Sequence, residues 1–200
     1  KETYDTLLGR VEKGAKLLIT VNSGLLCEFE KVTGLRSFGM SQGGHDSIEV
    51  AGKKIPFDYG KKFALKPLTA EVIASDSTGN AVFSKNRLGK GEVYILAFPL
   101  ETVVWRRQGA YEDNMPDYPA IYAEAAKEIL AGKPMRCDDP DVSLTLHPDG
   151  DDYYAVAVNY INEVRDAEPT IANGWKLEPV YGDFKAVEPC GLAIARLVLE

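Results

Sequence analysis

The segment from Glu92 to Phe98, EVYILAF, constrains the fold of this chain more than any other stretch. Its apolar residues run on without polar alternation, which is typical of a strand buried on both faces. Pro99 ends the strand, because proline has no N–H to donate to a neighbouring strand. Ala81 to Phe83 precede it across a Gly-rich connection, Arg87 to Gly91. The pattern predicts a hairpin whose second strand lies at the centre of an α/β sheet.

The N-terminal residues predict a helix followed directly by a buried strand. Tyr4, Leu7, Leu8 and Val11 form the i, i+3, i+4, i+7 stripe of an amphipathic helix, and residues 16–21 form an apolar run. A parallel sheet normally begins with a strand, and none precedes this helix. We therefore expect an α/β domain that is truncated at its N-terminus.

The remaining segments predict further short helices and strands and a boundary between two domains. A short helix is expected over residues 25–33, a Gly-rich loop over 34–47, strands over 47–58 and 71–74, and a helix over 118–130. After residue 134 the chain is β-rich, with strands expected over 142–147, 153–159 and 191–199. The prediction is an α/β domain over residues 1–133 and a small antiparallel β-sandwich over residues 134–200.

Charge and composition support this boundary and exclude several classes of protein. Residues 1–133 hold 18 Lys and Arg against 17 Asp and Glu, whereas residues 134–200 hold 5 against 13. A neutral or acidic surface gains no counterion release from phosphates, so no nucleic acid is expected as a partner. No apolar run reaches the roughly 18 residues of a membrane span, so no membrane partner is expected either.

The cysteines indicate neither a disulfide framework nor a zinc site, because Cys27, Cys137 and Cys190 lie far apart. No cofactor and no metal is expected. With no signal peptide pattern and no glycosylation sequon, a bacterial cytoplasmic location is favoured.

Four segments together resemble a known family. They are Val11 to Thr20, Ser23-Gly24, Ala70 to Ala74 and Asn86 to Tyr94. In this order they are similar to the trimerisation domain of bacterial β-galactosidases of the thermophile type, which is followed by a small β-domain. The resemblance implies a flavodoxin- or amidotransferase-like three-layer fold. It also implies a preceding catalytic TIM barrel as partner, homo-oligomerisation and a possible carbohydrate ligand, with no catalytic residue in this chain.

An alternative interpretation is a stand-alone hydrolase or amidotransferase-like enzyme that uses Ser41 or Cys27 as its nucleophile. Gly39 to Gly43 match the G-x-S-x-G pattern of a nucleophile elbow around Ser41, but that motif needs a buried strand before it and a helix after it. Cys27 follows the strand over residues 16–21, yet the bulky Leu25 and Phe29 flank it at the positions that an elbow keeps small. The sequence favours a flexible loop around Ser41 and a buried structural cysteine at Cys27.

A carbohydrate-binding module is a further alternative, with Trp175, Tyr153 or Tyr154 as stacking platforms on the β-domain. Two acidic sets are interpreted as surface turns, because neither has the spacing of a calcium loop. They are Asp138, Asp139 and Asp141, and Asp149, Asp151 and Asp152.

The preferred candidate site lies where two predicted strands end, since ligands of open α/β sheets bind outside the carboxyl ends of the strands. Its residues are Asn22, Ser23, Gly24, Trp105 and Arg106. Tryptophan and arginine are enriched in interfaces, so these are expected to be interface or pocket-wall residues. The predicted function is a non-catalytic assembly region of a glycoside hydrolase that supports the walls of a sugar site.

Overall fold

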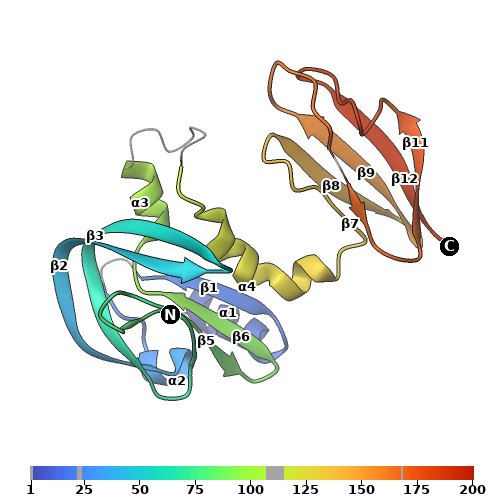
Figure 1. The fold of residues 1–200 in the computed structure, drawn as a ribbon. Helices are drawn as coiled ribbons and strands as arrows, with labels where there is room; N and C mark the ends of the chain where they lie inside the picture. The colour runs from blue at the N-terminus through green and yellow to red at the C-terminus, as the bar shows by residue number, and fades with distance from the viewer. Residues whose placement is uncertain (1, 22–23, 107–114, 168) are drawn as a thin grey trace. The chain divides into compact units, whose positions relative to one another are not determined.

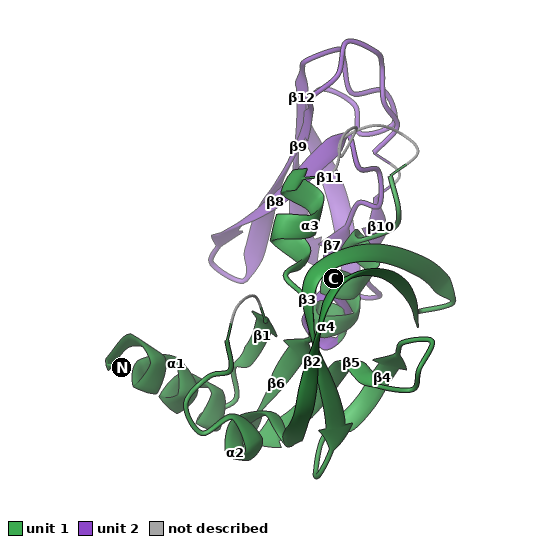
Figure 2. Ribbon diagram, turned by 90° about the vertical axis from the view of Figure 1, so that its left-hand side faces the viewer, with its two compact units in different colours: residues 1–127 green, residues 128–200 purple. Residues whose placement is uncertain are grey.

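A computed structural model describes residues 2–21, 24–106, 115–167 and 169–200. The chain divides into two compact units, residues 1–127 and 128–200, and the division falls within helix α4 (Pro119–Ala131) (Figure 2). The boundary expected after residue 133 stays a prediction. Each unit is described by itself below.

The central sheet of unit 1 has four strands in the order β1-β6-β5-β4 (Figure 2). Their bounds are β1 (Lys16–Thr20), β6 (Gly91–Leu96), β5 (Ala81–Leu88) and β4 (Glu71–Ser75). β1 and β6 are parallel, whereas β6 pairs antiparallel with β5 and β5 antiparallel with β4. The predicted hairpin is therefore confirmed, and the apolar segment forms an interior strand with a neighbour on each side.

A second, two-stranded sheet is a long curved hairpin, visible in blue and cyan in Figure 1. It consists of β2 (Leu35–Val50) and β3 (Lys53–Pro67), joined at Ala51 and Gly52, which both adopt positive φ. The prediction of a loop over residues 34–47 is wrong. These glycine-bearing residues are mostly exposed, but pairing with β3 along nearly their whole length holds them extended.

Three further helices belong to unit 1: α1 (Glu2–Glu12), α2 (Phe29–Thr33) and α3 (Leu100–Arg106). The end of α1 packs closely on the start of β6 at Gly91. A Cβ placed on Gly91 would overlap the carbonyl oxygens of Val11 and Ala15, so only glycine fits here. None of the helices in the described part of the chain is long and apolar enough to cross a membrane.

The three-layer flavodoxin- or amidotransferase-like fold is not what the chain adopts. The described residues form twelve strands and only four helices, distributed over several small sheets. Among the described strands only one pair is parallel, whereas a doubly wound fold needs successive parallel strands joined by helices on both faces. The apolar runs at residues 17–21 and 93–98 were correctly expected to be strands, but the connections between them are largely hairpins.

Aromatic packing joins the long hairpin to the central sheet. The rings of Phe57 in β3 and Phe98, just after β6, stack with centroids 4.0 Å apart and an interplanar angle of 3°. Both side chains are fully buried in a core that also contains Phe83, Ile95 and Leu96. This aromatic contact adds to the burial of both rings in holding the hairpin on the sheet.

A buried ionic cluster, formed by Lys62, Asp46 and Asp76, ties the same elements together. The Lys62 ammonium lies 2.8 Å from an Asp46 oxygen and 2.7 Å from an Asp76 oxygen. Asp46 and Lys62 come from the two strands of the hairpin, and Asp76 comes from the turn between β4 and β5. The cluster therefore fixes the hairpin to the edge of the central sheet.

Unit 2 contains a four-stranded antiparallel sheet in the order β11-β12-β9-β8 and a short pair, β7 with β10. The bounds are β7 (Met135–Arg136), β8 (Val142–Asp149), β9 (Asp152–Asn159), β10 (Thr170–Ile171), β11 (Trp175–Tyr181) and β12 (Leu192–Leu199). Its core is lined by small side chains of β9 and β12, among them Ala155, Ala157 and Ala195, with Phe184 and Val187 packed against them. The antiparallel β-character expected after residue 134 is confirmed.

Candidate functional site

The carboxyl ends of the parallel strands β1 and β6 lie side by side at one edge of the unit 1 sheet. Thr20 is the last residue of β1 and pairs in register with Leu96, the last residue of β6. The Val21 N–H then donates to the Leu96 carbonyl across 2.9 Å. This is the edge at which ligands bind in open sheets that contain parallel strands.

Glu101 in the first turn of α3 connects three elements at this edge. One of its carboxylate oxygens accepts a hydrogen bond from the Thr20 hydroxyl at 2.8 Å, and the other accepts one from the Tyr122 hydroxyl of α4 at 3.0 Å. Burial raises the pKa of Tyr122, and the hydrogen bond to Glu101 raises it further, to about 12. Tyr122 therefore remains a neutral hydrogen-bond donor throughout the physiological range.

Trp105 follows Glu101 by one helical turn, so the two side chains share a face of α3. The Trp105 side chain is 84% exposed, the highest value among the large hydrophobic residues of the described chain, and Arg106 beside it is also exposed. Gly24, after β1, is exposed as well. Asn22 and Ser23 lie outside the described residues. We refer to Thr20, Glu101, Trp105 and Tyr122 as the strand-end cluster.

The sequence located this edge but not the whole cluster. Pro99 to Glu101 mark the end of an apolar strand, which is a usable signal for Glu101. Tyr122, in contrast, lies within an ordinary amphipathic helix, and nothing in its spacing points to Glu101. The cluster forms only because α3 and α4 both meet the end of β1.

Ser41 does not sit on a nucleophile elbow. It lies within β2, paired in register with Lys62 of β3, where the motif would need a turn into a helix. His45 is four residues farther along the same strand, about 13 Å away at the usual rise per residue. Its Nδ1 contacts Asp58 Oδ1 at 2.7 Å instead, and within the described chain no hydrogen bond joins Ser41 to a histidine.

Cys27 has no catalytic surroundings either. Its backbone carbonyl accepts a hydrogen bond from the Tyr4 hydroxyl at 3.2 Å, and His147, the other histidine, hydrogen-bonds Thr145 within β8. The prediction that Cys27 is buried is wrong, because it is exposed. It lies in the turn just before α2, where its neighbour Leu26 packs against the core while Cys27 itself faces solvent.

The two acidic sets of unit 2 form turns and ion pairs. Asp139 accepts a hydrogen bond from the Asp141 N–H at 2.8 Å, and Asp141 pairs with Arg165 at 2.7 Å. Asp152 pairs with Arg196 at 2.9 Å. Across residues 2–21, 24–106, 115–167 and 169–200, no three His, Cys, Asp or Glu side chains gather in a way that could hold a metal ion.

The three aromatic residues proposed as stacking platforms do not form a flat row. The Tyr153 and Trp175 rings pack against each other at 5.5 Å with a 56° tilt, and both are half-buried against the unit 2 core. Tyr154 is the next residue along β9 and therefore points to the opposite face of the sheet. A carbohydrate platform would need coplanar exposed rings, which this arrangement does not provide.

Comparisons with known proteins find a similar fold among solved structures only. No family model matches the sequence, and no curated protein matches it. The fold, however, resembles a part of glycoside hydrolases of the GH42 type, and several solved structures match it over nearly its whole length.

Several of the solved structures that match nearly the whole of this chain are β-galactosidases. A catalytic mutant of Gan42B from G. stearothermophilus aligns with a TM-score of 0.62 and 13% identity over 98% of this chain. The enzyme from a Rahnella species aligns with a TM-score of 0.64 and 16% identity over 96% of this chain. The enzyme from Bacillus circulans sp. alkalophilus aligns with a TM-score of 0.59 and 16% identity over 97% of this chain. In each comparison this chain spans 30% of the length of the solved enzyme.

Proposed function

We propose that this chain is a non-catalytic assembly region of a carbohydrate-active glycoside hydrolase. The observation that carries the proposal is the fold match, which covers 96–98% of this chain but 30% of each matched β-galactosidase. The backbone at Ser41 agrees with it, because Ser41 lies within a strand paired with β3 rather than on an elbow. The catalytic domain, on this proposal, is a TIM barrel elsewhere in the same enzyme.

Within this proposal the strand-end cluster is the surface that contacts a partner domain or a second subunit. The nearly complete exposure of the Trp105 indole supports an interface role, since buried tryptophan and arginine dominate binding energy in interfaces. Glu101 is oriented by two hydrogen bonds and stands one turn away on the same helix face. A carboxylate beside an aromatic ring also suits the wall of a sugar site, because it accepts hydrogen bonds from hydroxyl groups.

The first test identifies the natural gene product. Antibodies raised against this chain are used to isolate that product from its host, and its intact mass and its activity on a chromogenic β-galactoside panel are measured. We expect a product much heavier than the 21.9 kDa of this chain, with glycosidase activity. A product of about this mass, or a heavier one inactive on every glycoside tested, would overturn the proposal.

The second test addresses assembly. The natural product and its Trp105→Ala variant are compared by sedimentation velocity, with Tyr160→Ala as the matched control because Tyr160 is another exposed aromatic residue, at 67%. We expect Trp105→Ala alone to shift the sedimentation coefficient toward smaller species. Equal sedimentation of all three proteins would remove the interface role of Trp105.

A further inference from the structure

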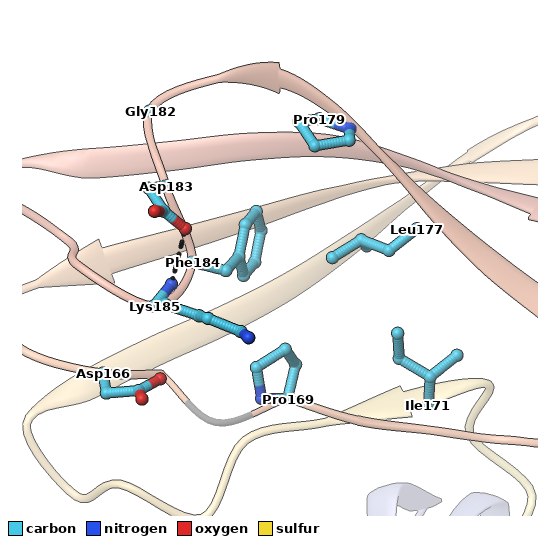
Figure 3. Close-up of a pocket in the computed structure, with 9 residues that line it drawn as sticks. All are labelled: Asp166, Pro169, Ile171, Leu177, Pro179, Gly182, Asp183, Phe184 and Lys185. Atoms are coloured by element: carbon cyan, nitrogen blue, oxygen red, sulfur yellow. Dashed lines mark hydrogen bonds between the residues drawn. The ribbon is translucent and has the colours of Figure 1, made fainter.

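A pocket of about 880 Å³ lies within unit 2, between the edge strand β11, the short strand β10 and the segment 182–185 (Figure 3). Its volume falls in the range of sites that hold small molecules. All of its lining residues belong to unit 2, whereas the residues of the strand-end cluster belong to unit 1.

Most of the residues that line the pocket are apolar. Phe184 is buried, Ile171 and Leu177 are half-buried, and Pro169 and Pro179 add ring faces that have few conformations to lose. Figure 3 shows the side chains of Phe184, Leu177 and Ile171 around one hollow. A ligand with an apolar face gains free energy by displacing water from this surface.

The backbone around the pocket is held in place before any ligand binds. The Ala167 N–H donates to the Phe184 carbonyl at 2.8 Å, and Arg165 and Val187 exchange two backbone hydrogen bonds. Gly182 has a φ of 65°, and a Cβ there would lie 2.8 Å from the Leu192 carbonyl oxygen. A preformed wall lowers the entropy cost of binding.

Three charged side chains stand around the rim: Asp166, Asp183 and Lys185. Asp183 Oδ1 accepts a hydrogen bond from the Lys185 N–H at 2.9 Å, which orients the carboxylate. The Lys185 side chain extends toward Pro169 in Figure 3. The rim therefore offers hydrogen-bond acceptors and an ammonium donor within one site.

This combination suits hydroxyl-bearing ligands without a negative charge. An anion would face two carboxylates, Asp166 and Asp183, against the single ammonium of Lys185, so the charge of the rim disfavours anions and leaves a neutral ligand without repulsion. Hydroxyl groups can donate to the carboxylates and accept from the ammonium, while a sugar's C–H face packs on Leu177 and Phe184. We propose that this pocket is a binding site for a neutral mono- or disaccharide. The proposal does not depend on the glycoside hydrolase assignment.

The test is an NMR titration of the isotopically labelled 200-residue chain. Lactose, maltose and cellobiose serve as neutral probes, and glucosamine and glucuronic acid as charged ones. We expect a neutral disaccharide to shift the amide signals of Ile171, Leu177 and Lys185 with a Kd on the order of 1 mM. Glucuronic acid should bind about tenfold more weakly or not at all, because its carboxylate meets those of Asp166 and Asp183, and glucosamine serves as the cationic comparison.

Two variants locate the binding. Lys185→Gln removes the ammonium and should weaken the neutral sugar about tenfold. Lys176→Gln is the matched control, because Lys176 precedes Leu177 on β11, points to the other face and pairs with Glu178. The proposal would be overturned if the parent chain bound none of the three disaccharides, or if the shifted amide signals lay elsewhere on the chain. It would also be overturned if Lys185→Gln bound the sugar as tightly as the parent chain.

Discussion

The Lys62 ammonium lies 2.7 Å from the Asp76 carboxylate, with both side chains withdrawn from solvent. Burial alone would raise the pKa of Asp76, but hydrogen bonds from Lys62, Thr78 and Asn80 outweigh it and hold that pKa well below its ordinary value. The same pairing raises the pKa of Lys62 against the effect of burial. The contact between the β2–β3 hairpin and the central sheet therefore depends on the charges of Lys62 and Asp76.

Lys62→Met should destabilise unit 1 strongly. The substitution leaves Asp46 and Asp76 buried beside each other without a cation, and breaking a buried ion pair typically costs about 3–5 kcal/mol. The measurement is hydrogen exchange of the β3 and β5 amides, which reports on unit 1 separately from unit 2.

Lys85→Met is the control for that substitution. Lys85 pairs with Glu71 at 3.3 Å, but Glu71 is largely exposed, so its loss should cost no more than about 1 kcal/mol. Equal protection in the two variants would show that the buried cluster does not stabilise the hairpin.

Asp76 should make the stability of unit 1 depend on pH in the acid range. Because its folded pKa is lower than the unfolded value of about 3.9, the carboxylate contributes stability above that value and loses it as pH falls toward the folded pKa. Asp76→Asn should therefore be less stable than the parent at pH 7 by about 1–3 kcal/mol.

The difference in the free energy of unfolding between the parent and Asp76→Asn should shrink progressively below about pH 5. Amide exchange rates measured at a series of pH values, corrected for intrinsic exchange, give the comparison. A difference that stays constant down to pH 3 contradicts the assigned shift.

Gly91→Ala should disturb the contact between α1 and the central sheet. The new methyl group would overlap the carbonyl oxygens of Val11 and Ala15, so backbone must move, at a cost of about 1–3 kcal/mol. Gly60→Ala is a matched control within another strand, since no atom lies within 4 Å of a Cβ placed there. Thermal unfolding followed by circular dichroism should show a lower first transition for Gly91→Ala alone. Identical curves for the two variants would refute the close approach.

Glu101→Gln should lower the pKa of Tyr122 from about 12 toward its ordinary value near 10. Burial of the phenol is the larger cause of the shift and remains, so a part of the elevation should persist. NMR titration of tyrosine labelled at Cζ measures the change, with Thr20→Val as a control that retains the carboxylate. An unaltered Tyr122 titration in Glu101→Gln would mean that the hydrogen bond does not form in solution.

Local sequence patterns correctly predicted several helices and strands of unit 1, because the spacing of apolar residues within a segment indicates its secondary structure. The unbroken apolar run from Val93 to Phe98 predicted an interior strand, and the stripe from Tyr4 to Val11 predicted a helix. Pairing partners were harder to predict. The glycine-bearing segment 34–47 is a strand only because β3 supplies the other half of its hydrogen bonds.

The layer architecture and the strand-end cluster depend on contacts that no local pattern contains. Thr20, Glu101 and Tyr122 come from a strand and two helices, and their spacing in the chain carries no motif. The same is true of Asp46, Lys62 and Asp76. Such groups become recognisable only once the elements are placed in space.

The two kinds of strand pairing in unit 1 imply an order of assembly. The β2–β3 hairpin can close outward from Gly52 through neighbouring residues, an event of about 1–10 μs in small hairpins. The parallel pair joins Lys16 to Glu92, which are 76 positions apart, and the entropy of closing that loop must be overcome first. The slow step in folding should therefore be the arrival of β1, and the strand at the centre of the sheet gains its second neighbour last.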